Sequence, residues 1–462
     1  MDKPVPLNLT TTVHLIVLTT VSLAQCADLQ LRSATYLRSP QADEACAIDI
    51  APDKSIVFAG RIPDSNFGVA PTELLGGGSG VVIRFNAAGT QVLSVTRIGQ
   101  SVDDMEVNRS NGQIAAIGEF GAVLLSSDAN EILWHSKLEP AGGGAVASNG
   151  RRIAIGSKGS VAALHGKRVT IFRSNGSVGS FILHQNSYVE DVALDDDTGR
   201  VFVVGFDNER LSALNKGCPN CPVQIAFMYC YDLKGNRAWT NYDWAGEECD
   251  NGNEADSRGL RIAMGRDGKL VFGAESAGGN SIFRWSPRKL GEKNHAAGDK
   301  FHNAYNTAAN HISYYARLDP ATGELLKGQF LLARLANNKG NAVRMHAVAA
   351  DEQGNVCVTG VSTFNMDKDN LPTVLGQVVA PAGGFVLVVN PDFSRRLLWT
   401  TFETNAYAST PRAIVAANGA IAIASTVTKD AMLTHNAVQK DANSPSKESP
   451  DAYIAVWTLD GQ

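Results

Sequence analysis

The segment Ala347–Gly360, AVAADEQGNVCVTG, decides the fold class of this chain. An alternating apolar run leads into a polar, glycine-containing turn, and a second apolar run ends on Gly360. This pattern is typical of a β-hairpin. The segment Val192–Gly205, VALDDDTGRVFVVG, repeats the same plan 155 residues earlier in the chain. The hairpin is therefore a recurring unit, and its other copies decide the architecture.

The unit occurs seven times along the chain. The copies are Cys46–Gly60, Asp104–Gly118, Gly144–Gly156, Asp191–Gly205, Leu260–Gly273, His346–Gly360 and Arg412–Ser425. A third apolar run and usually a fourth follow each copy, and four antiparallel strands make one propeller blade. The last copy lacks a fourth run, and the lone run Leu29–Leu37 has the length to supply it. We therefore predict an all-β, seven-bladed β-propeller with four-stranded blades, closed by an N-terminal strand that completes the last blade.

These copies resemble the repeats of secreted bacterial seven-bladed β-propellers, which have an apolar run, Asp, a Gly-Asn turn and an apolar run ending Thr-Gly. Ala347–Gly360 is the nearest match, whereas the third copy has no Asp and the seventh ends in Ser425. The resemblance covers nearly all of the chain after residue 24. It implies an architecture and export from the cytoplasm, not a particular chemistry.

The net charge of the chain and its N-terminal residues indicate where the protein is located and which partners it does not bind. The formal net charge is −5, which gives no basic surface for nucleic acid. Residues 1–24 hold an apolar stretch that ends in Ser22-Leu23-Ala24, as a signal peptide does, and no later stretch is long enough to span a membrane. We expect cleavage before Gln25, a single propeller domain over residues 25–462, and a secreted, extracellular or periplasmic protein.

An oxidising compartment changes how cysteines are interpreted, because neighbouring thiols tend to pair there. Four cysteines lie close together in the sequence and are disulfide candidates, with an all-thiolate zinc site as the alternative: Cys218, Cys221, Cys230 and Cys249. No cofactor is predicted. The acidic loop from Glu247 to Asp256 suits Ca²⁺, although its spacing does not match an EF-hand.

Long insertions indicate which face of the ring carries the site. The last residues of copies four to seven are 68, 87 and 65 residues apart, against about 40–50 for a plain blade. Enlarged loops in blades 4 to 6 are therefore expected to hold the functional residues. The residues just before each first run should surround the mouth of the central channel: Glu44, Asp103, Asp104, Glu190, Asp191, Asp256, Arg258, Arg344, His346 and Arg412.

The mixture of acids, cations and aromatic residues predicts a polar ligand, foremost a glycan or polysaccharide. Binding would use Asp104, Glu190, Asp256, Arg412 and Trp244. An enzyme acting on polysaccharide is the alternative. The catalytic candidates, with Arg to neutralise a uronate and His or Tyr to move a proton, are His302, His311, Tyr305, His346, Arg258 and Arg344. A hydrolase would instead need a carboxylate pair from Asp104, Glu190 and Asp256. A protein-interaction scaffold is the third possibility.

Overall fold

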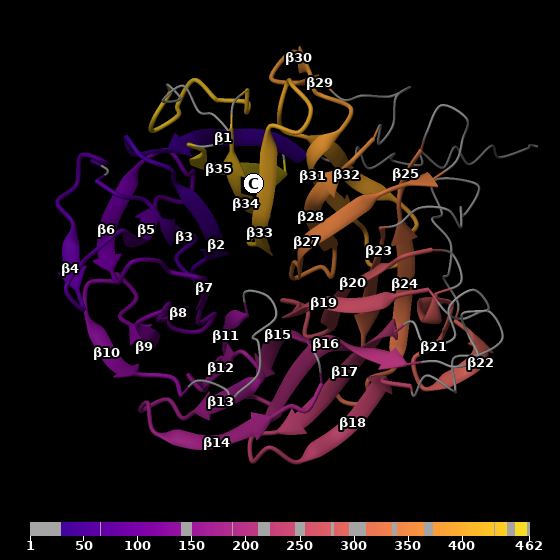
Figure 1. Ribbon diagram of the computed structural model, residues 1–462. Helices are drawn as coiled ribbons and strands as arrows, with labels where there is room; N and C mark the ends of the chain where they lie inside the picture. The colour runs from indigo at the N-terminus through magenta and orange to yellow at the C-terminus, as the bar shows by residue number, and fades with distance from the viewer. Residues whose placement is uncertain are drawn as a thin grey trace, which may run out of the picture.

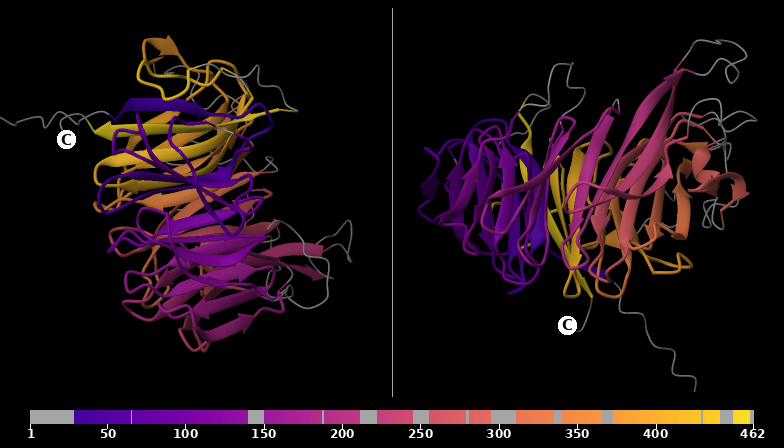
Figure 2. Two further views of the ribbon diagram at one scale, coloured as in Figure 1. Left: turned by 90° about the vertical axis from the view of Figure 1, so that its left-hand side faces the viewer. Right: turned by 90° about the horizontal axis from the view of Figure 1, so that it is seen from below.

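The computed structural model describes residues 29–459 apart from 65, 140–149, 187, 211–221, 245–254, 279–280, 295–310, 335–339, 365–372, 429 and 441–448. Seven small antiparallel sheets surround a central axis, which confirms the predicted seven-bladed propeller (Figure 1). Seen from the side, the ring is a thick disc with strands running across it (Figure 2).

The innermost strand of each blade lines the axis. In chain order these strands are β2 (Glu44–Ile50), β7 (Asp104–Val107), β11 (Arg151–Ile155), β15 (Tyr188–Asp195), β19 (Ser257–Met264), β27 (Val343–Ala350) and β33 (Ser409–Ala417). The second strands are β3 (Ile56–Arg61), β8 (Ile114–Gly118), β12 (Val161–His165), β16 (Arg200–Arg210), β20 (Leu270–Ser276), β28 (Val356–Ser362) and β34 (Ala420–Val427).

The outer half of each blade is built in the same way. The third strands are β5 (Gly80–Phe85), β9 (Gly121–Leu125), β13 (Arg168–Phe172), β17 (Pro222–Asp232), β23 (Ile312–Leu318), β31 (Gly383–Val389) and β35 (Asp451–Leu459). The outermost strands are β6 (Val92–Ile98), β10 (Ile132–Ser136), β14 (Val178–Leu183), β18 (Arg237–Tyr242), β24 (Leu325–Leu331), β32 (Arg396–Thr401) and, for blade 7, β1 (Leu29–Leu37).

Short elements decorate the connections of blades 1, 5 and 6. They are β4 (Thr72–Leu74), the 3₁₀ turn η2 (Ile282–Arg284), and the hairpins β21–β22 (Trp285–Ser286, Lys289–Lys293), β25–β26 (Ala333–Arg334, Gly340–Asn341) and β29–β30 (Thr373–Val374, Gln377–Val378). All of them join a second strand to a third or one blade to the next. Because strand direction alternates, these connections all lie on the face where the inner strands begin, hereafter the loop face.

Seven hydrophobic clusters are found among the described residues, one between each pair of neighbouring blades. The largest joins blades 4 and 5, where Phe283 stacks on Tyr314 with ring centroids 4.8 Å apart. Alternation in each strand supplies apolar side chains to both faces of its sheet, so each blade packs on two neighbours. The core is therefore a ring of interfaces rather than one central cluster.

The N-terminal strand completes the last blade, as predicted. β1 pairs with β35 from Leu29 opposite Leu459 to Leu37 opposite Ala452, so the two ends of the described chain meet in one sheet. Ala34 lies in this strand with no exposed surface and packs in the cluster between blades 6 and 7.

The third copy of the repeat differs from the predicted hairpin by one strand. In the copy Gly144–Gly156, the Asn149-Gly150 pair predicts a turn, and residues 151–155 after it are expected to form the second strand of blade 3. Instead they form the inner strand β11, which pairs with β12, while residues 140–149 lie outside the described residues. An Asn-Gly pair favours a turn but does not say which two strands the turn joins.

Cys230 is not a disulfide partner in this structure, which corrects that prediction. It is a free thiol buried in β17, opposite Phe202 and Trp239 in the cluster between blades 4 and 5. It also lies eight residues, or about 26 Å, along the strand from Pro222. Alternation points its side chain into the core. The other three candidates, Cys218, Cys221 and Cys249, lie outside the described residues.

Ring closure can be tested at Ala34. Replacing Ala34 with Asp places a carboxylate in the apolar cluster between blades 6 and 7, and we expect it to destabilise the fold by at least about 3 kcal/mol. Arg32→Asp, at an exposed position of the same strand, is the control and should change stability by less than about 0.5 kcal/mol. Denaturant unfolding of both variants measures the difference. Equal stabilities would contradict a closing role for β1.

Candidate functional site

Four of the predicted site residues meet at the loop face of blades 4 to 6. Asp256, Arg258, His311 and Arg344 form a connected group there with two residues that sequence reasoning missed, Gln224 and Glu275. We call these six residues the mouth cluster. Gln224 lies at the start of β17, Asp256 and Arg258 at the start of β19, and Arg344 at the start of β27. Glu275 lies near the end of β20, and His311 directly precedes β23. Strands of three different blades hold the group.

Glu275 is the centre of the mouth cluster. It is buried, and its Oε1 lies 2.5 Å from Arg258 Nη1 and 2.9 Å from His311 Nδ1. Arg258 is held further by Gln224 Oε1, to which its Nε donates, and by Asp256, 3.5 Å away. The backbone N–H of Gln224 donates to the other oxygen of Asp256 at 2.9 Å. The carboxylates of this cluster are therefore occupied by protein donors.

His311 links this buried group to solvent. Its Nε2 lies 2.6 Å from an Nη of Arg344, whose side chain is exposed. A guanidinium can only donate, so Nε2 accepts in this contact. The direct partner of Arg344 is thus a ring nitrogen rather than a carboxylate. Its positive charge is not neutralised by that contact.

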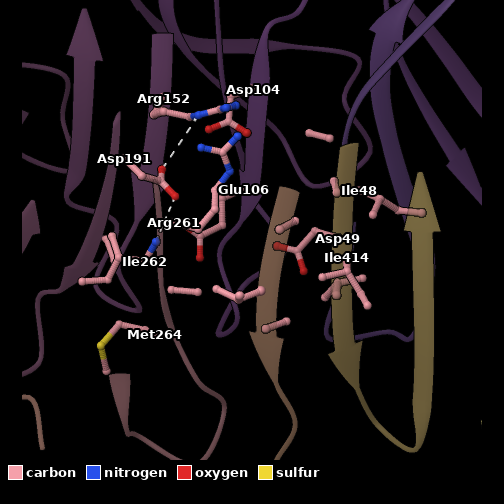
Figure 3. Close-up of a pocket in the computed structure, with 18 of the residues that line it drawn as sticks. Ile48, Asp49, Asp104, Glu106, Arg152, Asp191, Arg261, Ile262, Met264 and Ile414 are labelled. Atoms are coloured by element: carbon pink, nitrogen blue, oxygen red, sulfur yellow. Dashed lines mark hydrogen bonds and ion pairs between the residues drawn. The ribbon is translucent and has the colours of Figure 1, made fainter. Parts of the chain in front are cut away.

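A second group of charged side chains lines a pocket on the ring axis, hereafter the central pocket. The pocket has a volume of about 160 Å³. Its charged lining comprises Asp49, Asp104, Glu106, Arg109, Arg152, Asp191, Arg261, Arg266 and Arg412. Figure 3 shows Arg152, Asp104 and Asp191 close together, with Ile48 and Ile414 on the far wall. Asp104 and Arg412 were predicted site residues, and Asp191 was predicted at the channel mouth.

The pocket carboxylates bind the backbone of the next blade. Ile153 N–H donates to Asp104 at 3.0 Å, Ile155 N–H to Glu106 at 3.0 Å, and Ile262 N–H to Asp191 at 3.1 Å. Inner strands of neighbouring blades are too splayed to pair along their whole length, so their facing N–H groups need other acceptors. These acids therefore join blade 2 to blade 3 and blade 4 to blade 5.

Restricted access to water shifts the pKa values of these acids. Desolvation raises the pKa of Asp104 to about 6 and that of Glu106 to about 7, and it also raises the pKa of Asp191. Arg152 and Arg109 oppose the shifts of Asp104 and Glu106, respectively. Burial lowers the pKa of His346 to about 4, so its ring is neutral at pH 7, with Nδ1 2.8 Å from the carbonyl oxygen of Pro411.

The other predicted residues lie at several places. Glu190 is half-buried on β15, near Arg152 and Arg261. Trp244 packs edge-on against Tyr242 with centroids 5.7 Å apart, at the margin of the core between blades 4 and 5. His302 and Tyr305 lie outside the described residues, as does most of the acidic loop predicted to suit calcium. Among the described residues, no group of three or more potential metal ligands is found.

Some of the missed residues carried a sequence signal. Asp49, Glu106 and Arg261 are charged residues inside otherwise apolar inner strands, which is a mark of a polar channel. Gln224 and Glu275 had no such mark, because each begins or ends an ordinary strand. β-bulges interrupt the inner strands of five blades, at Cys46, Glu190, Leu260, His346 and Arg412, and alternation across a bulge does not predict which residues face the axis.

Comparisons with known proteins assign no relationship. No protein-family model matches the chain, and no curated protein matches it in sequence. None of the described helical segments is long and apolar enough to cross a membrane.

Arg266 provides a test of the inner ring. It donates to the Ile50 carbonyl at 2.8 Å and lies 3.2 Å from Asp49, and both groups of this ion pair are about nine-tenths buried. We expect Arg266→Ala to lower the free energy of unfolding by about 3 kcal/mol, because it leaves a buried carboxylate without its cation. Adding Asp49→Asn to this variant should recover part of the loss. Lys158→Ala, which breaks an exposed pair with Asp197, should cost less than about 1 kcal/mol. Equal losses in chemical unfolding would argue against this role.

Glu106 should make stability depend on pH. Its folded pKa of about 7 exceeds the unfolded value of 4.5, so its contribution is complete below pH 4.5 and is lost as pH rises through 7. Glu106→Gln keeps an acceptor for Ile155 but cannot ionise. The free energy of unfolding of the Glu106→Gln variant, relative to that of wild type, should therefore rise by about 1–3 kcal/mol as the pH increases from 4.5 to 8. The exposed Glu73→Gln is the control, and a pH-independent difference for Glu106→Gln would refute the assignment.

Proposed function

We propose that this protein is a secreted binding module for a carboxylate-bearing polysaccharide, which it holds on the loop face of blades 4 to 6. The observation that carries the proposal is the exposed Arg344, positioned by His311 rather than by a carboxylate. A guanidinium whose charge is not cancelled by its neighbour is well suited to a ligand carboxylate, which it can contact through two parallel hydrogen bonds.

The rest of the mouth cluster supports this role by holding Arg344 in place. Arg258 and His311 share Glu275, and Gln224 and Asp256 fix Arg258 in turn. Pre-positioned polar groups lose little side-chain entropy when a ligand binds. The hairpins β21–β22, β25–β26 and β29–β30 of blades 5 and 6 lie on this face and give an extended polymer more surface to contact. Export is supported by the apolar residues at the N-terminus.

The same contact favours one alternative, a polysaccharide lyase. If a ligand uronate draws Arg344 away from His311, the Nε2 lone pair becomes free to accept the proton next to the carboxylate. Arg344 would then neutralise the substrate and His311 would act as the base. The two proposals share their residues and differ in whether the polymer is cleaved.

Binding to immobilised polygalacturonate tests the proposal, with neutral amylose as the reference polymer. We expect retention on the acidic polymer, a loss of about tenfold in affinity for Arg344→Gln, and partial recovery for Arg344→Lys. Lys327→Gln removes an exposed cation from the outer strand of blade 5 and should bind as wild type does.

Four results would overturn or replace the proposal. The absence of retention on every acidic polymer, or unchanged affinity of Arg344→Gln, would refute it and favour a protein-interaction scaffold. Release of unsaturated ends that absorb in the ultraviolet, abolished by His311→Asn, would establish the lyase instead. New reducing ends without that absorbance would indicate a hydrolase.

A further inference from the structure

Two arginines lie at the end of the central pocket opposite the loop face. Arg109, in the turn after the inner strand of blade 2, donates to the carbonyls of Met264 and, at 3.1 Å, Gly265 in blade 5. Arg266, in the equivalent turn of blade 5, reaches Ile50 and Asp49 of blade 1. Blades 2 and 5 are three places apart in the ring, as are blades 5 and 1, so both contacts cross the axis. The two arginines therefore bridge the axis at the end of the pocket away from the loop face.

The lining of the pocket includes arginine donors that have no acceptor. Asp191 accepts from Val192 N–H and Ile262 N–H, one at each oxygen, and Asp104 accepts from Ile153. By contrast, the Nε of Arg152 is shielded from solvent without an acceptor, and its nearest carboxylate oxygen, on Asp191, is 4.0 Å away. Arg412 is exposed at the wall of the pocket and has no hydrogen bond or ion pair among the described residues.

Arg152 and Arg412 both line the central pocket. They come from blades 3 and 7, and both act electrostatically on the thiol of Cys46 in blade 1. Arg261 from blade 5 adds a third guanidinium to the lining, which donates to the carbonyls of His346 and Leu260 rather than to a carboxylate. A compact group with several acceptor oxygens suits donors of this kind.

We propose that the central pocket binds a small oxyanion, of the carboxylate, sulfate or phosphate class, which enters from the loop face and is held by Arg412 and Arg152. The volume of about 160 Å³ has room for several water molecules or one such group, but not for a polysaccharide chain. The anion accepts the unused N–H groups in place of water. This site is separate from the mouth cluster and does not depend on the polymer-binding proposal.

Titration of the lining gives the site a pH dependence. Glu106 faces Arg109 on its own blade, Asp49 on blade 1 and the Ile155 N–H on blade 3. Asp104 faces Arg152 on blade 3 and Asp191 on blade 4. Both acids gain protons as the pH falls from 8 to 6, while the arginines stay charged, so the pocket becomes more positive. Affinity for a sulfate ion, whose own charge is constant in this range, should rise.

Isothermal titration calorimetry of the full mature chain with sodium sulfate, phosphate, acetate and glucuronate tests the inference. We expect saturable binding to at least one of them, tighter for sulfate at pH 6 than at pH 8, and at least fivefold weaker for Arg412→Gln, roughly the effect of losing one charged hydrogen-bond donor. Arg412→Lys should retain most of the affinity. Because Arg412 has no partner among the described residues, its replacement should leave the melting temperature unchanged.

Two control variants locate the site. Arg32→Gln changes an exposed arginine on β1 and should bind all four anions as wild type does. Arg344→Gln changes the mouth cluster and should bind sulfate as wild type does, because only the carboxylate probes resemble the ligand proposed for Arg344. The inference is wrong if wild type binds none of the four probes or if Arg412→Gln binds as tightly as wild type. It is also wrong if Arg344→Gln weakens binding as much as Arg412→Gln, since the anion would then occupy the mouth cluster. Binding of glucuronate but not of acetate would assign the pocket to a sugar acid rather than to free ions.

Discussion

The pairing of β1 with β35 is the interaction on which the whole structure depends. Each blade has an apolar cluster on both sides, so an open array would leave two large apolar faces in water. The first strand of the described chain joins the last sheet, and this one antiparallel ladder links the two ends of the sequence. Only the closed ring gives every sheet two neighbours. It also brings the seven inner strands around one axis, where both candidate sites begin.

The two groups of polar residues are built by different means. In the central pocket, carboxylates accept backbone N–H groups of the adjacent blade, and arginines donate to backbone carbonyls across the axis. These side chains satisfy main-chain groups that the curvature of the ring leaves unpaired. In the mouth cluster, side chains contact one another, and the chain of contacts ends at an exposed cation. A substitution of a pocket residue that binds the backbone, such as Arg266, should therefore affect stability first, whereas one at Arg344 or Arg412 should affect binding first.

Two arginines bridge the ring at one end of the pocket. Arg109 and Arg266 join opposite blades across the axis, on the side away from the loop face. The proposed polymer on blades 4 to 6 and the proposed small anion on the axis would use different arginines, so single substitutions should separate the two activities.

The sequence alone determined the number of blades, the hairpin unit and the closure by an N-terminal strand, because these follow from repetition and from the two-residue period of a strand. It also predicted Arg258, His311 and Arg344 as site residues, and the structure joins these three in one group of contacts. Only the tertiary structure decided that Glu275 and Gln224 join them, since residues from three blades meet there without any regular spacing in the chain. The phase of the third repeat and the burial of Cys230 also required the structure, because an Asn-Gly turn or a group of cysteines has the same local sequence in several arrangements. Tertiary contacts likewise decided that Arg109 and Arg266 reach across the axis, since curvature of the ring, and not local propensity, sets which backbone carbonyls need a donor.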